Sequence, residues 1–136
     1  MIYLDSCALV KLVRREPGSV ELVGWLAADQ QAGLPLVTSS LVEIEVPRAL
    51  RRSAPDSLAG VPSTLARLFR LEIDQVIRQT AAAYTDPMLR SLNAIHLATA
   101  QILAGQLSVF VTYDKKLLDA AKGIGIATAS PGAYDS

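Results

Sequence analysis

The feature that most constrains the fold is the separation between short apolar runs that have the composition of β-strands. Residues 2–4 (I-Y-L) form one such run and residues 34–38 (L-P-L-V-T) form the next, with a helical pattern over residues 5–33 between them. Neighbouring strands joined by so long a connection are parallel, because a hairpin needs only a few residues and a parallel crossover needs many more. The sequence therefore predicts an α/β fold.

Helical and strand-like segments continue to alternate along the chain. Asp74 stands at a helix N-cap position, Pro47 should kink or weaken the end of its helix, and residues 53–62 have the composition of a surface connection. Apolar spacing and capping residues predict helices over residues 6–14, 18–32, 40–52, 63–70, 74–83, 90–105 and 113–123, and further strands over residues 71–73, 107–112 and 126–129.

The composition limits the class of protein and its surroundings. The 136 residues are 51% hydrophobic and 19% charged, which favours one compact domain over residues 1–136 and argues against disorder. Cys7 is the only cysteine, and no secretory signal is recognised. No apolar run approaches the roughly 20 residues that span a bilayer. We therefore expect a cytoplasmic protein with no membrane segment.

The charge balance restricts how the protein could bind a polyanion. Thirteen basic and thirteen acidic side chains cancel, so any polyanion would have to be bound by a local basic patch. Two candidate groups are Arg48, Arg51 and Arg52 at the end of one predicted helix, and Lys115 and Lys116 at the start of another. An ordinary solvated helix surface explains the same residues equally well.

Two aspartates stand just after predicted strands. Asp5 follows residues 2–4 and Asp114 follows residues 107–112, and ligands of open α/β sheets bind outside the carboxyl ends of the strands. If the two strands are neighbours, both carboxylates lie within reach of one divalent cation, which offsets their repulsion. Each aspartate alone is explained as well by an N-cap of the following helix, so this prediction depends on their convergence.

Two glutamates begin the helix after the second predicted strand, and they have different explanations. Ser40 and Glu43 fit the S-x-x-E capping box, in which the glutamate bonds to its own helix end. Glu45 lies on a different helical face and has no such explanation. Glu45 is therefore the better candidate to face the edge of the sheet.

His96 and Cys7 carry chemically active side chains but are predicted to be structural. His96 lies three residues after Asn93, on the same helical face, and is the only histidine. We interpret it as a structural histidine with satisfied hydrogen bonds at a helix surface. Cys7 has no partner thiol and no basic neighbour, so we expect it in the core and not as a nucleophile.

Four stretches of the chain together resemble the PIN-domain ribonucleases, and most closely the VapC toxins of bacterial toxin–antitoxin pairs. The stretches are M-I-Y-L-D-S-C-A-L-V-K-L, S-S-L-V-E-I-E-V-P-R-A-L, L-R-S-L-N-A-I-H-L-A-T-A and V-F-V-T-Y-D-K-K-L. Each is a modest signal alone, but their order and spacing over nearly the whole chain are specific. The resemblance implies a PIN-like three-layer fold, in which helices flank a central, mostly parallel sheet of short strands.

The resemblance also implies a site, a cofactor and partners. It assigns catalytic metal binding to Asp5, Glu45, Asn93 and Asp114, and lining of the same pocket to Ser6 and Thr112. Family members cleave single-stranded or looped RNA, often tRNA or ribosomal RNA, with Mg²⁺ or Mn²⁺. They typically form homodimers and are silenced by a cognate VapB-like antitoxin. These ions prefer hard oxygen ligands and keep waters, so a ring of carboxylates suits them.

Asn93 departs from the family pattern, which has an aspartate at this position. With Ser91 as N-cap, Asn93 falls in the first helical turn, where the helix dipole and a metal both favour a carboxylate. Asparagine offers a carbonyl oxygen but no charge. We expect lower metal affinity and weak or absent hydrolysis in an intact fold. An engineered inactivating substitution, which the intact surrounding motif favours, and a natural change are both open.

Two other functions are weighed against the ribonuclease. A catalytically inactive PIN-fold module would keep only antitoxin or RNA binding, and Asn93 makes this alternative serious. A phospho-acceptor receiver domain is also α/β with acids at strand ends. It would need paired acids after the first strand and a lysine after a late strand. Here Ser6 follows Asp5, and no lysine follows residues 126–129.

Overall fold

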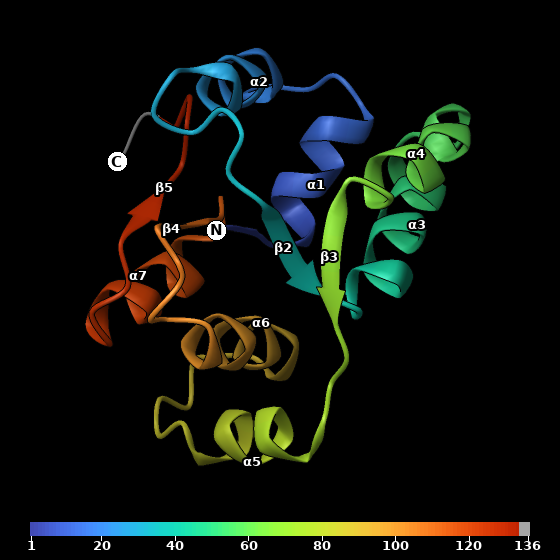
Figure 1. Ribbon diagram of the computed structural model, residues 1–136. Helices are drawn as coiled ribbons and strands as arrows, with labels where there is room; N and C mark the ends of the chain where they lie inside the picture. Colours follow the sequence, from blue (N-terminus) through green and yellow to red (C-terminus); the bar gives the residue numbers. More distant parts are fainter. Residues whose placement is uncertain (134–136) are drawn as a thin grey trace.

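The computed structural model describes residues 1–133 and is built around a five-stranded parallel sheet (Figure 1). The strands are β1 (Ile2–Leu4), β2 (Leu36–Ser39), β3 (Leu68–Leu71), β4 (Val109–Val111) and β5 (Thr128–Ala129). Their order across the sheet is β3-β2-β1-β4-β5, and all the pairings between neighbours are parallel. The predicted α/β class and the predicted parallel pairing of the first two strands are confirmed.

Helices connect the strands and cover both faces of the sheet (Figure 1). They are α1 (Ser6–Val13), α2 (Ser19–Ala27), α3 (Val42–Ser53), the 3₁₀ helix η1 (Pro55–Gly60), α4 (Val61–Leu65), α5 (Gln75–Ala83), α6 (Ser91–Ile102) and α7 (Lys115–Gly123). Within the described part of the chain, none of them combines the length and the apolar character that crossing a membrane requires.

The alternation of side chains along β1 divides the core into two halves. Ile2 and Leu4 point to one face, where they pack with buried residues of α1, α2, α3 and α4. Tyr3 points to the other face, where it packs with buried residues of α6 and α7. Successive strand residues face opposite sides, so a central strand that is buried throughout requires a helical layer on each side. The three-layer architecture expected from the family resemblance is present.

Some predicted boundaries are wrong. The helix predicted over residues 63–70 ends at Leu65, and β3 begins at Leu68 instead of residue 71. Pairing with β2 explains the difference, because Leu36 to Ser39 align with Leu68 to Leu71 and hold this segment extended. The helix predicted over residues 18–32 ends at Ala27.

The middle of the chain also differs from its predicted form. α3 runs past Pro47 to Ser53, close to its predicted end at residue 52, but it begins at Val42 instead of residue 40. Residues 53–62 contain the 3₁₀ helix and the first turn of α4, with Val61 buried, where a surface connection was predicted.

The sheet order brings the two predicted acidic positions to one edge. β1 and β4 are direct neighbours, and Leu4 pairs with Val111. Asp5 and Asp114 follow these strands, so both carboxylates belong to the carboxyl edge of the sheet, where ligands of parallel sheets bind. The sequence predicted that Asp5 and Asp114 lie close together if their strands are neighbours, and the two strands are neighbours.

Candidate active site

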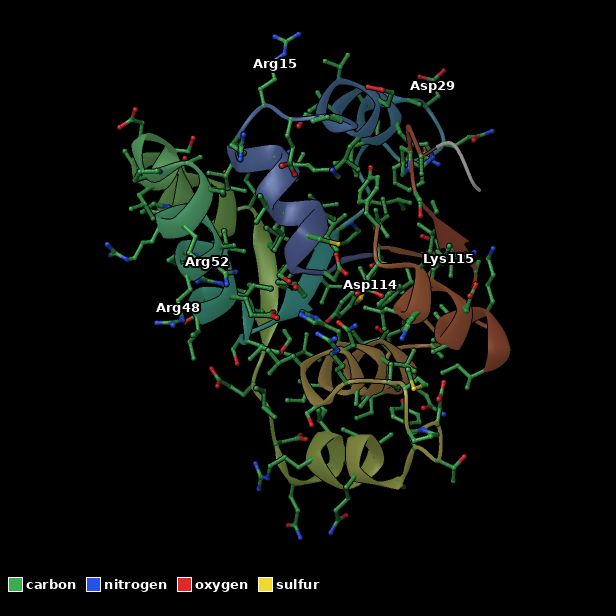
Figure 2. All side chains as sticks on the ribbon, turned by 180° about the vertical axis from the view of Figure 1, so that it is seen from behind. Arg15, Asp29, Arg48, Arg52, Asp114 and Lys115 are labelled. Atoms are coloured by element: carbon green, nitrogen blue, oxygen red, sulfur yellow. The ribbon has the colours of Figure 1, made fainter. Side chains whose placement is uncertain are left out.

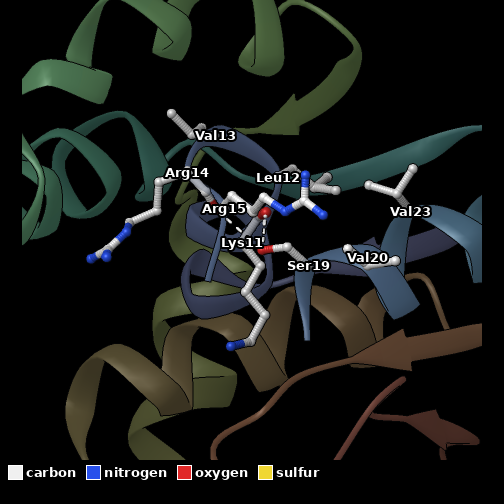
Figure 3. Close-up of a pocket in the computed structure, with 8 residues that line it drawn as sticks. All are labelled: Lys11, Leu12, Val13, Arg14, Arg15, Ser19, Val20 and Val23. Atoms are coloured by element: carbon white, nitrogen blue, oxygen red, sulfur yellow. Dashed lines mark hydrogen bonds between the residues drawn. The ribbon is translucent and has the colours of Figure 1, made fainter. Parts of the chain in front are cut away.

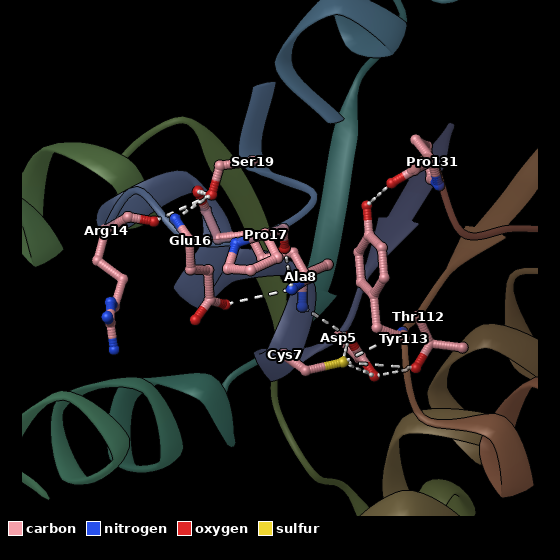
Figure 4. Close-up of polar contacts among 11 residues, drawn as sticks. Asp5, Cys7, Ala8, Arg14, Glu16, Pro17, Ser19, Thr112, Tyr113 and Pro131 are labelled. Atoms are coloured by element: carbon pink, nitrogen blue, oxygen red, sulfur yellow. Dashed lines mark hydrogen bonds and ion pairs between the residues drawn. The ribbon is translucent and has the colours of Figure 1, made fainter. Parts of the chain in front are cut away.

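Asp5 is a buried carboxylate held by uncharged donors (Figure 4). It is the N-cap of α1, and its Oδ1 accepts a hydrogen bond from the Ala8 N–H at 3.0 Å. The Thr112 hydroxyl donates to Oδ2 at 2.5 Å, and the Cys7 thiol donates to Oδ1 at 3.0 Å. Its exposed fraction is 2%. Both oxygens are therefore hydrogen-bonded, but none of these donors carries a charge.

The environment of Asp5 favours a nearby cation. Burial raises the pKa of its carboxyl group, although His96 and the hydrogen bonds from Cys7 and Thr112 act in the opposite direction. Within residues 1–133, no lysine or arginine forms an ion pair with Asp5. A positive ion next to this carboxylate would offset the cost of burying its charge.

Asp114 and Asn93 form the second part of the site. Asp114 is the N-cap of α7, and its Oδ1 accepts from the Leu117 N–H at 3.0 Å. Its Oδ2 accepts from the Asn93 amide at 3.2 Å, and its own N–H donates to Thr112 Oγ1 at 3.1 Å. Thr112 therefore bonds to both aspartates. The predicted N-cap explanation also applies to Asp5 and Asp114.

The N-cap predicted for the helix that carries Asn93 is wrong. Arg90 is the N-cap of α6 and its side chain makes no capping bond, so Ser91 is the first helical residue and not the cap. Asn93 still lies in the first turn. Its side-chain N–H₂ is directed to Asp114, a contact that an ionised aspartate at position 93 would not make, because a carboxylate has no donor.

Glu45 is held separately from the two aspartates. Its Oε1 accepts a hydrogen bond from His96 Nε2 at 2.7 Å. Together with Ser6 and Leu92, it lines a cavity of about 600 Å³. Ser6 follows Asp5 and Leu92 precedes Asn93, so this cavity lies next to both of these residues.

The capping role predicted for Glu43 is wrong. α3 begins at Val42 with Leu41 as a cap that makes no side-chain bond, and Glu43 instead pairs with Arg70 of β3 at 3.3 Å. The later start of the helix moves Glu43 away from the predicted box with Ser40. The side chain has a structural partner, as predicted, but a different one.

His96 and Cys7 differ from their predicted surroundings. His96 has satisfied hydrogen bonds, as predicted, but it is buried and not at a helix surface, because Tyr3 and Glu45 enclose it. Cys7 is half-buried at the site instead of lying in the apolar core. Burial, together with the charge of Asp5, raises the pKa of the Cys7 thiol, which disfavours the thiolate a nucleophile requires.

Basic residues lie on both sides of Asp114 (Figure 2). Arg48, Arg51 and Arg52 line the cavity that contains Glu45, and Lys115 and Lys116 line a second cavity together with Asn93 and Asp114. Figure 2 shows Arg48 and Arg52 on one side of Asp114 and Lys115 on the other.

The second cavity also contains Arg90, which the sequence reasoning missed. Its position three residues before Asn93, at the start of the same helix, was the available signal. A further cavity between α1 and α2 is lined by Lys11, Arg14, Ser19 and their neighbours, and by none of the predicted site residues (Figure 3).

The candidate metal ligands are all oxygen donors. In residues 1–133, no group of three or more His, Cys, Asp or Glu side chains is arranged to hold a metal. The candidate donors are carboxylate and amide oxygens, the hard ligands that Mg²⁺ and Mn²⁺ prefer. Mg²⁺ commonly binds one or two carboxylates and keeps several waters, so it does not require such a group. The chemistry of these donors, and a buried Asp5 that forms no ion pair with a lysine or arginine of residues 1–133, therefore fit a hard divalent cation.

Comparison with known proteins gives the family. The chain matches the PIN domain family model over residues 2–123. It is 52% identical over 134 residues to ribonuclease VapC35 of Mycobacterium tuberculosis, covering 97% of this chain and 98% of that protein. The chain therefore belongs to the PIN domain family, and the receiver-domain alternative is not favoured.

Solved structures agree with this assignment of the fold. The crystal structure of Mycobacterium tuberculosis VapC20, a sarcin-ricin loop cleaving toxin, superimposes with a TM-score of 0.74 at 14% identity, covering 96% of this chain and 100% of that chain. VapBC2 from Rickettsia felis, solved bound to a DNA fragment from its promoter, gives a TM-score of 0.66 at 15% identity, with coverage of 96% and 99%.

Proposed function

We propose that this protein is a VapC-type endoribonuclease toxin that hydrolyses RNA with Mg²⁺ or Mn²⁺ and is neutralised by a cognate antitoxin. The observation that carries the proposal is the link between Asp5 and Asp114 through Thr112, at the carboxyl ends of the adjacent strands β1 and β4. Such a pair of carboxylates at a parallel-sheet edge suits metal-assisted phosphodiester hydrolysis. The strong similarity to a ribonuclease supports the same activity.

The site residues have different roles in this reaction. The metal would be held by Asp5, Glu45, Asn93 and Asp114. When bound, it would lower the pKa of a water and neutralise charge on the phosphate. Thr112 fixes the Asp5 carboxylate and the start of α7 by its two hydrogen bonds. The candidate phosphate ligands on the two sides of the site are Arg48, Arg51, Arg52, Lys115 and Lys116.

Asn93 limits the activity in this proposal. Its amide donates to Asp114, so its side chain contributes a neutral oxygen and no charge to the metal site. Aspartate at this position would add a fourth negative charge. We infer that the protein as it stands binds metal weakly and hydrolyses RNA slowly, while its fold is unaffected.

The partners are also part of the proposal. An antitoxin partner is supported by the similarity of the fold to VapBC2, a toxin–antitoxin pair. A homodimer follows from the family resemblance. The length and composition of the chain support a single PIN domain over residues 1–136, and the composition supports a cytoplasmic setting. The last three residues of that range lie outside the described residues.

Cleavage of total RNA tests the proposed activity. The native chain and its Asn93→Asp variant are incubated with RNA and Mn²⁺ or Mg²⁺, with and without EDTA. An Asn93→Asp/Asp5→Asn double variant controls for contaminating nuclease. We expect discrete, EDTA-sensitive fragments from Asn93→Asp, and far fewer from the native chain and the double variant.

Two results would overturn the proposal. Equal cleavage by Asn93→Asp and the double variant would mean that the acids do not catalyse the reaction. No cleavage by any variant, with no metal binding, would mean that the acids are structural and that the protein binds its partner without cutting RNA.

A further inference from the structure

A buried chain of hydrogen bonds links the interior of the sheet to Glu45. The Tyr3 hydroxyl lies 2.7 Å from His96 Nδ1, and His96 Nε2 lies 2.7 Å from Glu45 Oε1. Tyr3 is fully buried and His96 is 1% exposed. Buried polar side chains normally satisfy each other in this way, but this chain ends at a proposed metal ligand.

The direction of the hydrogen bond to Glu45 follows from the groups involved. An ionised Glu45 carboxylate can only accept, so His96 Nε2 carries a proton and donates it. The Tyr3 hydroxyl can both donate and accept, so it pairs with Nδ1 whether or not this nitrogen carries a proton.

Packing fixes the two aromatic members of this chain. The Tyr3 ring stacks on Phe110 of β4, with ring centroids 5.0 Å apart and an interplanar angle of 11°. The His96 ring meets Tyr3 edge to face at 81°. A donor held this firmly selects one orientation of the carboxylate it binds.

Glu45 depends on this donor. Within residues 1–133, the bond from His96 is the one hydrogen bond that its side chain makes, and 16% of the side chain is exposed. One oxygen is therefore occupied, while the other has no hydrogen-bond partner in the described structure. The carboxylate also lines the cavity that contains Ser6, next to Asp5.

We propose that His96, held in place by Tyr3, is a positioning residue that orients Glu45 toward the divalent cation of the site. The inference rests on the proposed function, because it takes Glu45 as a metal ligand. Partners that orient a ligand in this way commonly change metal affinity by about 10- to 100-fold when they are removed. The histidine itself touches neither metal nor RNA in this proposal.

Mn²⁺ titration followed by electron paramagnetic resonance measures the effect without requiring RNA cleavage. His96→Leu removes the donor, and we expect Mn²⁺ affinity to fall about tenfold or more. His96→Gln places an amide donor near the position of Nε2, so it should recover most of the lost affinity. Tyr3→Phe keeps the ring and removes only its hydroxyl, so it should lower affinity less than His96→Leu.

A matched variant separates positioning from general disturbance of α6. Ala98 is fully buried on the same helix and does not belong to the core cluster that packs with Tyr3. Ala98→Gly should lower the free energy of unfolding without changing Mn²⁺ affinity. In a Glu45→Gln background, His96→Leu should cause no further loss, because the two residues act as a unit.

The outcomes distinguish this inference from the proposed function. Native Mn²⁺ affinity in His96→Leu, or an undiminished further loss when His96→Leu is added to Glu45→Gln, would overturn the positioning role and leave the metal site intact. A native chain and an Asn93→Asp variant that both fail to bind Mn²⁺ would overturn this inference together with the metal dependence of the proposed reaction.

Discussion

Asp74 and Asp114 begin two helices in the same way, yet only one of them belongs to the candidate site. Each is an exposed N-cap before a nine-residue helix, and its Oδ1 accepts the N–H three residues later, at 2.9 Å for Asp74 and 3.0 Å for Asp114. Asp114 additionally accepts from Asn93 and shares Thr112 with Asp5. The cap is a local property, whereas the site is created by the neighbouring strand.

This contrast provides a built-in control. A substitution at Asp74 removes a cap alone, and the same substitution at Asp114 removes a cap and a proposed metal ligand. Effects on folding should therefore be similar at the two positions, while effects on metal and RNA should differ. Asp5 adds a third case, a cap that is buried.

The largest difference is expected in catalysis. In the Asn93→Asp background, Asp114→Asn should lower the rate of RNA cleavage by about 100-fold, equivalent to about 2.7 kcal/mol in the barrier. Asp74→Asn should leave the rate within about twofold, because surface changes away from the site have small effects. Initial rates in Mn²⁺ measure both. Equal losses at the two positions would mean that the cap, and not metal binding, limits activity.

The next effect concerns metal-dependent stability. Asn93→Asp replaces a donor to Asp114 with a second carboxylate, so without metal the free energy of unfolding should fall by about 1 kcal/mol. Mn²⁺ at about one hundred times its dissociation constant should restore about 2.7 kcal/mol. Urea unfolding with and without Mn²⁺ measures this. The same gain in an Asn93→Asp/Asp114→Asn variant would place the ion elsewhere.

Loss of either exposed cap should have a smaller and nearly equal effect. Asp74→Ala and Asp114→Ala should each lower the free energy of unfolding by about 1 kcal/mol in metal-free buffer, the usual cost of losing an N-cap. Urea unfolding of the two variants side by side measures the comparison. A much larger loss at Asp114 would show that its contacts with Asn93 and Thr112 are mainly structural.

A modest pH effect should distinguish buried Asp5 from the exposed caps. Because burial raises the folded-state pKa of Asp5, the native state binds its proton more tightly than the unfolded chain does. Metal-free stability should therefore fall as the pH rises from the unfolded pKa to the folded pKa, and Asp5→Asn should remove this fall. Urea unfolding between pH 3 and pH 7 (roughly the range of carboxyl titration) tests it, with Asp74→Asn as control. An unchanged slope in Asp5→Asn would contradict the assignment.

The local features could be predicted from the sequence. Apolar runs and their long separation predicted parallel strands, and the spacing of Asp74 predicted its cap. The adjacency of β1 and β4 was stated only as a condition, because no local pattern encodes which strands pair. The structure supplies it through the pairing of Leu4 with Val111.

The errors in these predictions have a common cause, because contacts between residues far apart in the sequence determine the features concerned. The helical spacing of Leu65 and Leu68 extended the predicted helix, but pairing with β2 makes residues 68–71 a strand. The predicted capping box is absent because α3 begins at Val42, and Glu43 pairs instead with Arg70 of that strand. His96 was placed at a surface because its partners Tyr3 and Glu45 are remote in sequence. Each contact depends on the assembled sheet.

The most direct test of the account is the position of a bound metal. Crystals of Asn93→Asp grown with Mn²⁺ should show an anomalous-scattering peak coordinated by Asp5 and Asp114, with Glu45 directed toward it, and no peak beside Asp74. A peak at Asp74 or elsewhere on the surface, with none between Asp5 and Asp114 at saturating Mn²⁺, would contradict the claim that the ends of β1 and β4 form a metal-dependent nuclease site.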